Sequence, residues 1–204
     1  VWKAQPVGEL DPEEYHDFQV NRPVMGRGPD GERTITWPTT TVWVAELPQR
    51  TVVLVHGIEP SMRWRSFTRE LLDHAERLRV GTVVTLGALL ADVPHTRPIP
   101  VTATSEDAGL LAKLAVEPSR YEGPTGIVGV LQDVAQNRGI PGLSLWAAVP
   151  HYVGQPPSPK AMLALLRSVE EMLASITDYE VIRLDADGAV RSWNPGAERL
   201  RQYS

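Results

Sequence analysis

The sequence predicts an α/β protein with a three-layer α/β/α architecture, in which helices cover both faces of a mixed sheet. Two continuous runs of apolar and β-branched residues, Thr51–Gly57 and Gly81–Leu89, are typical of strands that are buried on both faces of a parallel sheet. Leu143–Val149 is a third run of this kind. Segments with helical periodicity lie between these runs, and such alternation with right-handed crossovers gives layered α/β domains.

The helices are predicted from apolar residues that recur three or four positions apart. The strongest helix spans Pro159–Ser175, where Ser158 can cap the first turn and Pro159 suits the first helical position. Its apolar stripe is Met162, Leu165, Leu166, Val169, Met172 and Leu173. Two further helices follow from the sets Phe67, Leu71, Ala75, Leu78 and Ile127, Val130, Leu131, Val134.

The N-terminal third alternates apolar and polar residues, as half-buried strands do. Glu14–Val20, Arg33–Trp37 and Thr40–Glu46 show this alternation. The turn-rich run GRGPDGE lies between the first two, so these segments predict an antiparallel hairpin region.

Composition excludes several classes of protein. The chain has 204 residues, of which 42% are hydrophobic and 22% are charged, which fits an ordinary globular protein. Its net charge of −5 argues against a nucleic-acid partner. Cysteine is absent, so disulfides, thiolate metal sites and cysteine nucleophiles are excluded. No apolar stretch reaches the roughly 18 residues of a membrane helix, and no secretion signal opens the chain, so we expect a cytoplasmic location without membrane association.

Polar side chains follow the predicted strands and can gather on one side of an α/β sheet, where ligands bind. The candidates for a cleft or an interface are His56, Glu59, Arg63, Trp64, Asp92, His95, Glu122 and His151. His95 with Asp92 and Glu122 could perform acid–base chemistry, but no residue is recognisable as an activated nucleophile. The spacing of these residues predicts no metal site and no cofactor. For Arg63 and Trp64 a structural or interface role is favoured, because arginine and tryptophan are common in protein contacts.

Two glycine motifs have both functional and structural interpretations. Gly123, Thr125 and Gly126 stand at the start of a predicted helix, where backbone N–H groups could hold an anion. No Gly-Lys-Ser/Thr follows, so a turn at Gly123 with close helix–sheet packing at Gly126 or Gly129 is favoured. The run VLVHG (Val53–Gly57) is similar to the oxyanion strand of α/β-hydrolases, but the best nucleophile candidate, Ser144, lies inside a predicted strand rather than at its end.

Several separated blocks resemble the proteasome assembly chaperone family, in the branch of the second eukaryotic chaperone and with the look of actinobacterial members. The blocks are VVLVHGIEPSMRWRSF, GTVVTLGALLADVPHTRPIPVT, SRYEGPTGIVGVLQ and LWAAVPHYVGQPPSPKAMLALL, and the resemblance covers about residues 1–174. It implies a nucleoside-phosphorylase-like fold and a non-enzymatic, assembly-chaperone-like role. It also implies protein partners, with proteasome subunits among them, and a homo-oligomer. The alternative is a small-molecule binder or enzyme, hydrolase-like or phosphorylase-like, that uses a cleft at the strand ends.

The N-terminal and C-terminal ends of the chain differ from the pattern of this family. Members of the family begin earlier, with a strand and a helix that are missing here, and the final Gln202-Tyr203-Ser204 lacks the hydrophobic–Tyr tail of proteasome-docking factors. We predict one α/β domain over residues 1–176, followed by a tail over residues 177–204. The tail resembles the start of a PAS domain, with two strands and a helix at Asn194-Pro195; a plain hairpin and helix that finish the first domain are the alternative.

Overall fold

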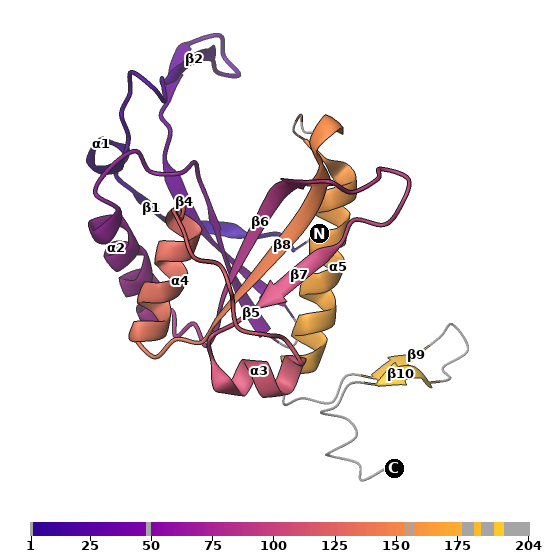
Figure 1. Ribbon diagram of the computed structural model, residues 1–204. Helices are drawn as coiled ribbons and strands as arrows, with labels where there is room; N and C mark the ends of the chain where they lie inside the picture. Colours follow the sequence, from indigo (N-terminus) through magenta and orange to yellow (C-terminus); the bar gives the residue numbers. More distant parts are fainter. Residues whose placement is uncertain are drawn as a thin grey trace. The chain divides into compact units, whose positions relative to one another are not determined.

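A computed structural model describes residues 2–47, 50–153, 155, 157–176, 182–184 and 190–193 (Figure 1). The chain divides into two compact units, and each is built from two separate stretches of sequence. The first unit contains Val1–Gly81 and Gly123–Arg138, and the second contains Thr82–Glu122 and Gly139–Ser204.

The first unit contains a three-stranded sheet in the order β1-β4-β5, and both strand pairs are antiparallel. The strands are β1 (Gln5–Leu10), β4 (Thr40–Leu47) and β5 (Arg50–His56). The prediction that the run containing β5 is a doubly buried parallel strand is therefore wrong. Only two residues separate β4 from β5, and a parallel pairing needs a crossover of a dozen or more residues.

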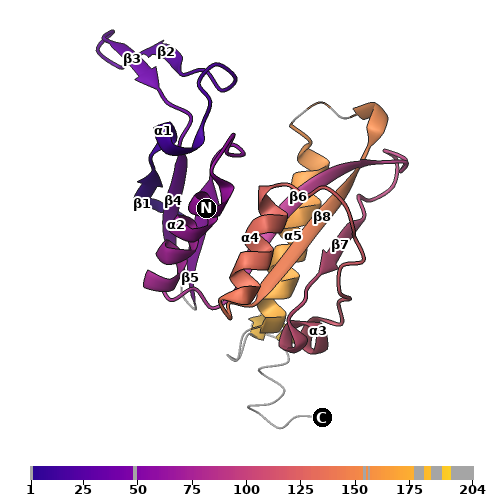
Figure 2. The ribbon, with the colours of Figure 1, turned by 60° about the vertical axis from the view of Figure 1, so that its left-hand side comes forward.

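A separate two-stranded hairpin pairs β2 (Val24–Arg27) with β3 (Arg33–Thr36). In both views it extends away from the sheet of its own unit (Figures 1 and 2). The predicted hairpin across GRGPDGE is thus confirmed, but its first strand is β2 and not Glu14–Val20.

The segment Glu14–Val20 contains no strand; instead, the short helix α1 (Pro12–Tyr15) ends within it. Asp11 caps this helix, because its carboxylate accepts the Glu13 N–H at 3.0 Å, and Pro12 occupies the first helical position. These local helix-start residues override the alternating pattern on which the strand prediction was based.

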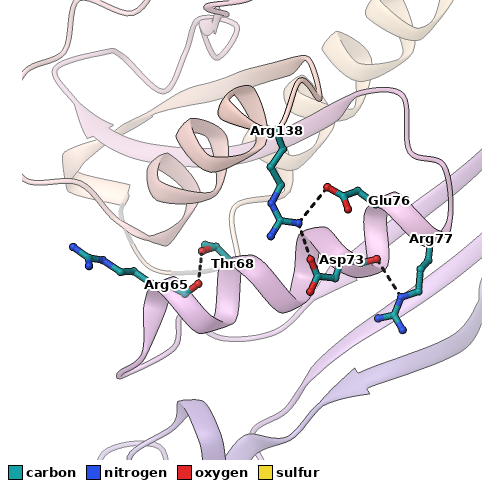
Figure 3. Close-up of polar contacts among 6 residues, drawn as sticks. All are labelled: Arg65, Thr68, Asp73, Glu76, Arg77 and Arg138. Carbon is teal, nitrogen blue, oxygen red and sulfur yellow. Dashed lines mark hydrogen bonds and ion pairs between the residues drawn. The ribbon is translucent and has the colours of Figure 1, made fainter.

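Two helices supply the rest of the core of the first unit, α2 (Trp64–Arg77) and α4 (Ile127–Asn137). Their apolar residues meet the sheet in one cluster that consists of Leu10, Tyr15, Val42, Phe67 and Leu71, with Val53, Ile127 and Leu131 packed against it. At the far end of α4, the Arg138 guanidinium pairs with Asp73 at 2.7 Å and Glu76 at 3.2 Å (Figure 3). This pair of contacts fastens the end of α4 to α2 and raises the pKa of Arg138 above its ordinary value, mainly through the hydrogen bond to Asp73.

The second unit contains a mixed sheet in the order β6-β8-β7. β6 (Val83–Ala91) runs parallel to the central strand β8 (Gly142–Pro150), whereas β7 (Val101–Thr104) is antiparallel to it. The predictions of strands at Gly81–Leu89 and Leu143–Val149 are confirmed, and β7 is a strand that the sequence analysis missed.

Side chains of β8 alternate between a face that packs on helix α5 (Pro159–Ile176) and a less buried face. Figure 2 shows α5 running along the sheet of its unit. The packed face joins α5 and the short helix α3 (Ala108–Leu114) in two clusters, Ile99, Ala147, Val149 and Ala161, and Leu110, Leu143, Leu145 and Met172. The predicted helix Pro159–Ser175 is confirmed.

Beyond α5, the strands β9 (Ile182–Leu184) and β10 (Val190–Trp193) pair antiparallel. The two strands predicted in the tail are therefore present, whereas the helix predicted at Asn194-Pro195 lies outside the described residues. The α/β class is confirmed, as a mixed fold with several sheets and helices. None of the described helices combines the length and the apolar character that crossing a bilayer requires.

Candidate functional site

The predicted site residues divide between the two units, and some of those in each unit form a cluster. The first cluster surrounds the loop between β5 and α2, which carries Glu59, Arg63 and Trp64. The second lies at the carboxyl ends of β6 and β8, which are adjacent because these strands are parallel.

Glu59 closes the start of helix α4. Its Oε1 atom accepts the backbone N–H of Ile127 at 2.8 Å, and a Cβ atom added to Gly126 would lie 3.0 Å from the same oxygen. Gly126 is the N-cap residue and provides no side-chain cap of its own, so the carboxylate takes over this role from a distant part of the sequence. A negative charge here is favoured by the helix dipole. The anion-binding start that the sequence suggested at Gly123–Gly126 therefore holds the chain's own carboxylate.

Gly126 and Gly129, near the start of α4, lie close to polar side chains and not to a strand of the sheet, and Gly123 lies just before them. Gly123 has a φ of 153°, a conformation that side chains rarely adopt. A Cβ atom on Gly129 would meet the hydroxyl of Thr125. The predicted turn at Gly123 is consistent with this geometry, whereas the close helix–sheet packing expected at Gly126 or Gly129 is replaced by contacts with Glu59 and Thr125.

Arg63 and Trp64 make contacts within the same unit. The Arg63 guanidinium forms an ion pair with Glu14 of α1, and the Trp64 indole N–H donates to the Pro60 carbonyl at 2.6 Å. Arg63 also adopts a left-handed backbone conformation, with φ 55° and ψ 36°, at the start of α2. Both side chains thus fix the loop to its surroundings, which is one of the two roles, structural or interface, that the sequence left open.

Tyr15 also holds the loop between β5 and α2 in place, and it was not among the residues predicted from the sequence. Its backbone carbonyl accepts the N–H groups of Ser61 and Met62 at 2.8 and 3.2 Å, and its ring packs edge-on against Phe67. Its hydroxyl donates to a carboxylate oxygen of Glu70 on α2. Burial and the hydrogen bond to Glu70 raise the pKa of Tyr15 to about 12.

This pKa predicts a loss of stability at alkaline pH. The unfolded chain releases the Tyr15 proton near pH 10, whereas the folded chain keeps it to about pH 12, so rising pH favours the unfolded state. Between pH 9 and pH 11 the free energy of unfolding of the natural chain should fall by about 1.3 kcal/mol more than that of Tyr15→Phe. Urea denaturation at both pH values measures this difference. Equal losses in the two proteins would show that the hydroxyl does not titrate abnormally.

In the second cluster, Tyr152 joins two of the predicted histidines. Its hydroxyl oxygen accepts the backbone N–H of His95 at 2.9 Å and lies 3.0 Å from the Nδ1 atom of the same residue. The ring of His151 meets Tyr152 edge-on, with centroids 5.3 Å apart. The Tyr152 hydroxyl therefore contacts both the backbone and the ring of His95. Tyr152 itself was missed from the sequence, although its position next to His151 could have revealed it.

Lys160, at the start of α5, completes this second cluster. Its ammonium donates to the carbonyls of His95 and Arg97 at 2.5 and 2.6 Å, which fastens the loop after β6 to the helix. Asp92 follows β6 directly and is exposed, as are His56 at the end of β5 and Glu122. Among the described residues, the polar and ring contacts of His95 are with Tyr152 and Lys160 rather than with the predicted Asp92 and Glu122. Within the described ranges, no group of three or more His, Asp or Glu residues could hold a metal ion.

The fold is a mixed α/β fold, and Glu59, Arg63 and Trp64 contact neighbouring residues of the first unit. The sequence pattern of the PAC2 family matches residues 1–191, and the chain belongs to this family. A PAC2 family protein from Streptomyces avermitilis is 54% identical over 84% of this chain and 74% of its own, with a TM-score of 0.81.

Two further solved structures place the family in context. A proteasome-assembly chaperone homologue from Mycobacterium tuberculosis is 46% identical over 98% of this chain and 79% of its own, with a TM-score of 0.76. An archaeal proteasome activator from Pyrococcus furiosus shares the fold at 19% identity, over 84% of this chain and 73% of its own, with a TM-score of 0.64. The comparison with curated protein sequences gave no match. The resemblance inferred from the sequence blocks, including its actinobacterial character, is confirmed.

Proposed function

We propose that this chain is a non-enzymatic protein that binds other proteins in the manner of an assembly chaperone, with proteasome subunits as its candidate partners. The observation that carries the proposal is the use of Glu59 as an internal cap. The glycine-bearing helix start that could have bound a phosphate or another anionic substrate is closed by the chain's own carboxylate, at 2.8 Å from the Ile127 nitrogen. The contacts of Arg63, Trp64 and Lys160 likewise fix loops of their own units.

The exposed surface supports the same conclusion. Large apolar side chains are exposed on the β2–β3 hairpin and on α5, and such surfaces mark sites of protein contact. The description of the M. tuberculosis relative as a proteasome-assembly chaperone homologue supports proteasome subunits as the first partners to test.

The test is native mass spectrometry of the full chain mixed with unassembled proteasome α and β subunits of an actinobacterium such as S. avermitilis. At about 10 μM of each protein, a partner with a Kd in the low micromolar range would appear as a distinct complex. We expect a complex with at least one subunit type, and none with an unrelated acidic protein of similar size. A folded chain that binds neither subunit type at this concentration would contradict the assignment of proteasome subunits as partners.

The second candidate function is small-molecule binding at the carboxyl ends of β6 and β8, and the grouping of His95, His151 and Tyr152 favours it. This alternative predicts that a nucleoside with inorganic phosphate raises the thermal midpoint of the chain, because a ligand that binds the folded state stabilises it. The protein-binding proposal predicts an unchanged midpoint.

A further inference from the structure

His16 of the first unit is a buried titratable residue. It follows helix α1 directly, and only 4% of its surface is exposed. Among the described residues, no group forms a hydrogen bond with its Nδ1 atom, which is shielded from solvent as well. Buried polar atoms normally have a partner. Protonation would place a hydrogen on both ring nitrogens, and Nδ1 would then be a buried charged donor without an acceptor, so this position favours the neutral imidazole.

The charged side chains on the elements next to His16 do not compensate such a charge. Four carboxylates there have other partners: Glu14 pairs with Arg63, Asp17 accepts the Gln19 N–H, Glu59 accepts the Ile127 N–H, and Glu70 accepts the Tyr15 hydroxyl. Four further charged side chains of β1, α1 and α2 are exposed to solvent, namely Glu9, Glu13, Arg65 and Arg69. Burial lowers the pKa of His16 below its ordinary value of 6.5.

His16 stands at the joint between α1 and the loop that leads from β5 to α2. The carbonyl of the preceding residue, Tyr15, accepts the N–H groups of Ser61 and Met62 in that loop at 2.8 and 3.2 Å. The helix α1 has four residues, and the two side chains of its ion pair with the loop are about half exposed, so this pair contributes little stability. A short contact of this kind can open at a lower free energy than the unfolding of the whole unit.

We propose that protonation of His16 releases α1 from the loop between β5 and α2, so that the first unit contains an acid-sensitive switch. Release breaks the two hydrogen bonds of the Tyr15 carbonyl and uncovers the ring of Phe67, on which the Tyr15 ring packs. In the open state the imidazole lies in water and titrates near pH 6.5, whereas in the closed state it resists protonation. The open state therefore binds more protons, and a fall in pH below 6.5 favours it. The switch goes beyond the protein-binding role, because it needs no partner.

The test is amide hydrogen exchange of the full chain, measured by NMR spectroscopy at pH 7 and pH 5. The protection factor of each N–H group corrects for the direct effect of pH on exchange and reports how often the group is released. For Ser61 and Met62 we expect protection to fall about tenfold from pH 7 to pH 5, because the open state takes up a proton in this range. The protection of the paired amides in β8 of the second unit should stay unchanged.

Two variants and a matched control connect this fall to His16. His16→Gln and His16→Phe both remove the titrating ring, so the protection of Ser61 and Met62 should agree at the two pH values within about twofold. His56→Gln removes an exposed histidine of the same unit and should keep the full effect. An NMR titration of the natural chain, which does not depend on the folding of a variant, should show His16 titrating below pH 6.5. The proposal is overturned if His16 titrates at 6.5 in the folded chain, if protection does not fall, if the fall survives the loss of His16, or if β8 shows the same fall.

Discussion

Replacing Gly57 with alanine should lower the free energy of unfolding by about 2–3 kcal/mol. Gly57 follows β5 directly, and a Cβ atom at this position would lie 2.8 Å from the Cα atom of Thr40 and closer still to its hydroxyl oxygen. Thr40 is buried at the start of β4, so its backbone cannot move aside without disturbing the sheet. Urea denaturation of the full chain measures the change.

Gly81→Ala is the matched control in the same unit. No atom lies within 4 Å of a Cβ built on Gly81, so this substitution should change the free energy of unfolding by about 0.5 kcal/mol or less. If Gly57→Ala lowers the free energy of unfolding no more than Gly81→Ala does, the close approach to Thr40 is not the reason why glycine follows Val53–His56. A functional reason for Gly57 would then be favoured.

The second large effect is expected at Gly87 in the middle of β6. Gly87 stands directly opposite Trp146 of β8, and a Cβ atom at this position would lie 2.5–2.8 Å from three atoms of the indole ring. The indole occupies the space that the glycine leaves free. Gly87→Val should therefore cost about 2 kcal/mol, because the rigid ring must leave its position.

A double-mutant cycle isolates this contact. In a Trp146→Leu background the cost of Gly87→Val should shrink to well below 1 kcal/mol, because the obstructing ring is gone and valine suits a strand. Equal costs in both backgrounds would show that Gly87 is required for a reason other than the indole.

The sequence reveals those parts of the fold that depend on local patterns. The strands β6 and β8 and the helix α5 were predictable, because long apolar runs and a wide helical stripe are unambiguous. The region of Glu14–Val20 was predicted wrongly because its alternation suits a strand, while the helix start at Asp11-Pro12 precedes it. β7 follows a segment with several prolines and has only four residues, so its pattern is too short to recognise.

The candidate site was only partly predictable, because its decisive contacts join residues far apart in sequence. Glu59 and Ile127 are separated by 68 residues, and no local pattern indicates that one caps the helix of the other. The contact of Lys160 with the carbonyls after β6 is also a product of tertiary structure. Glu59, His95 and His151 were recognised as candidates, whereas the contacts of the two histidines with Tyr152 and of His95 with Lys160 emerged only from the folded chain.

The interleaved order of the two units has a consequence for how the chain folds during synthesis. The core of the first unit includes Ile127 and Leu131 of α4, yet residues 82–122, which belong to the second unit, are synthesised before that helix. When the nascent chain has emerged from the ribosome only as far as Gly81, helix α4 has not yet been synthesised. The apolar faces of the sheet and of α2 in the first unit are therefore not yet covered by α4. Because exposed apolar surface in such intermediates promotes aggregation, we expect the nascent first unit to be prone to aggregation until about residue 138 has emerged.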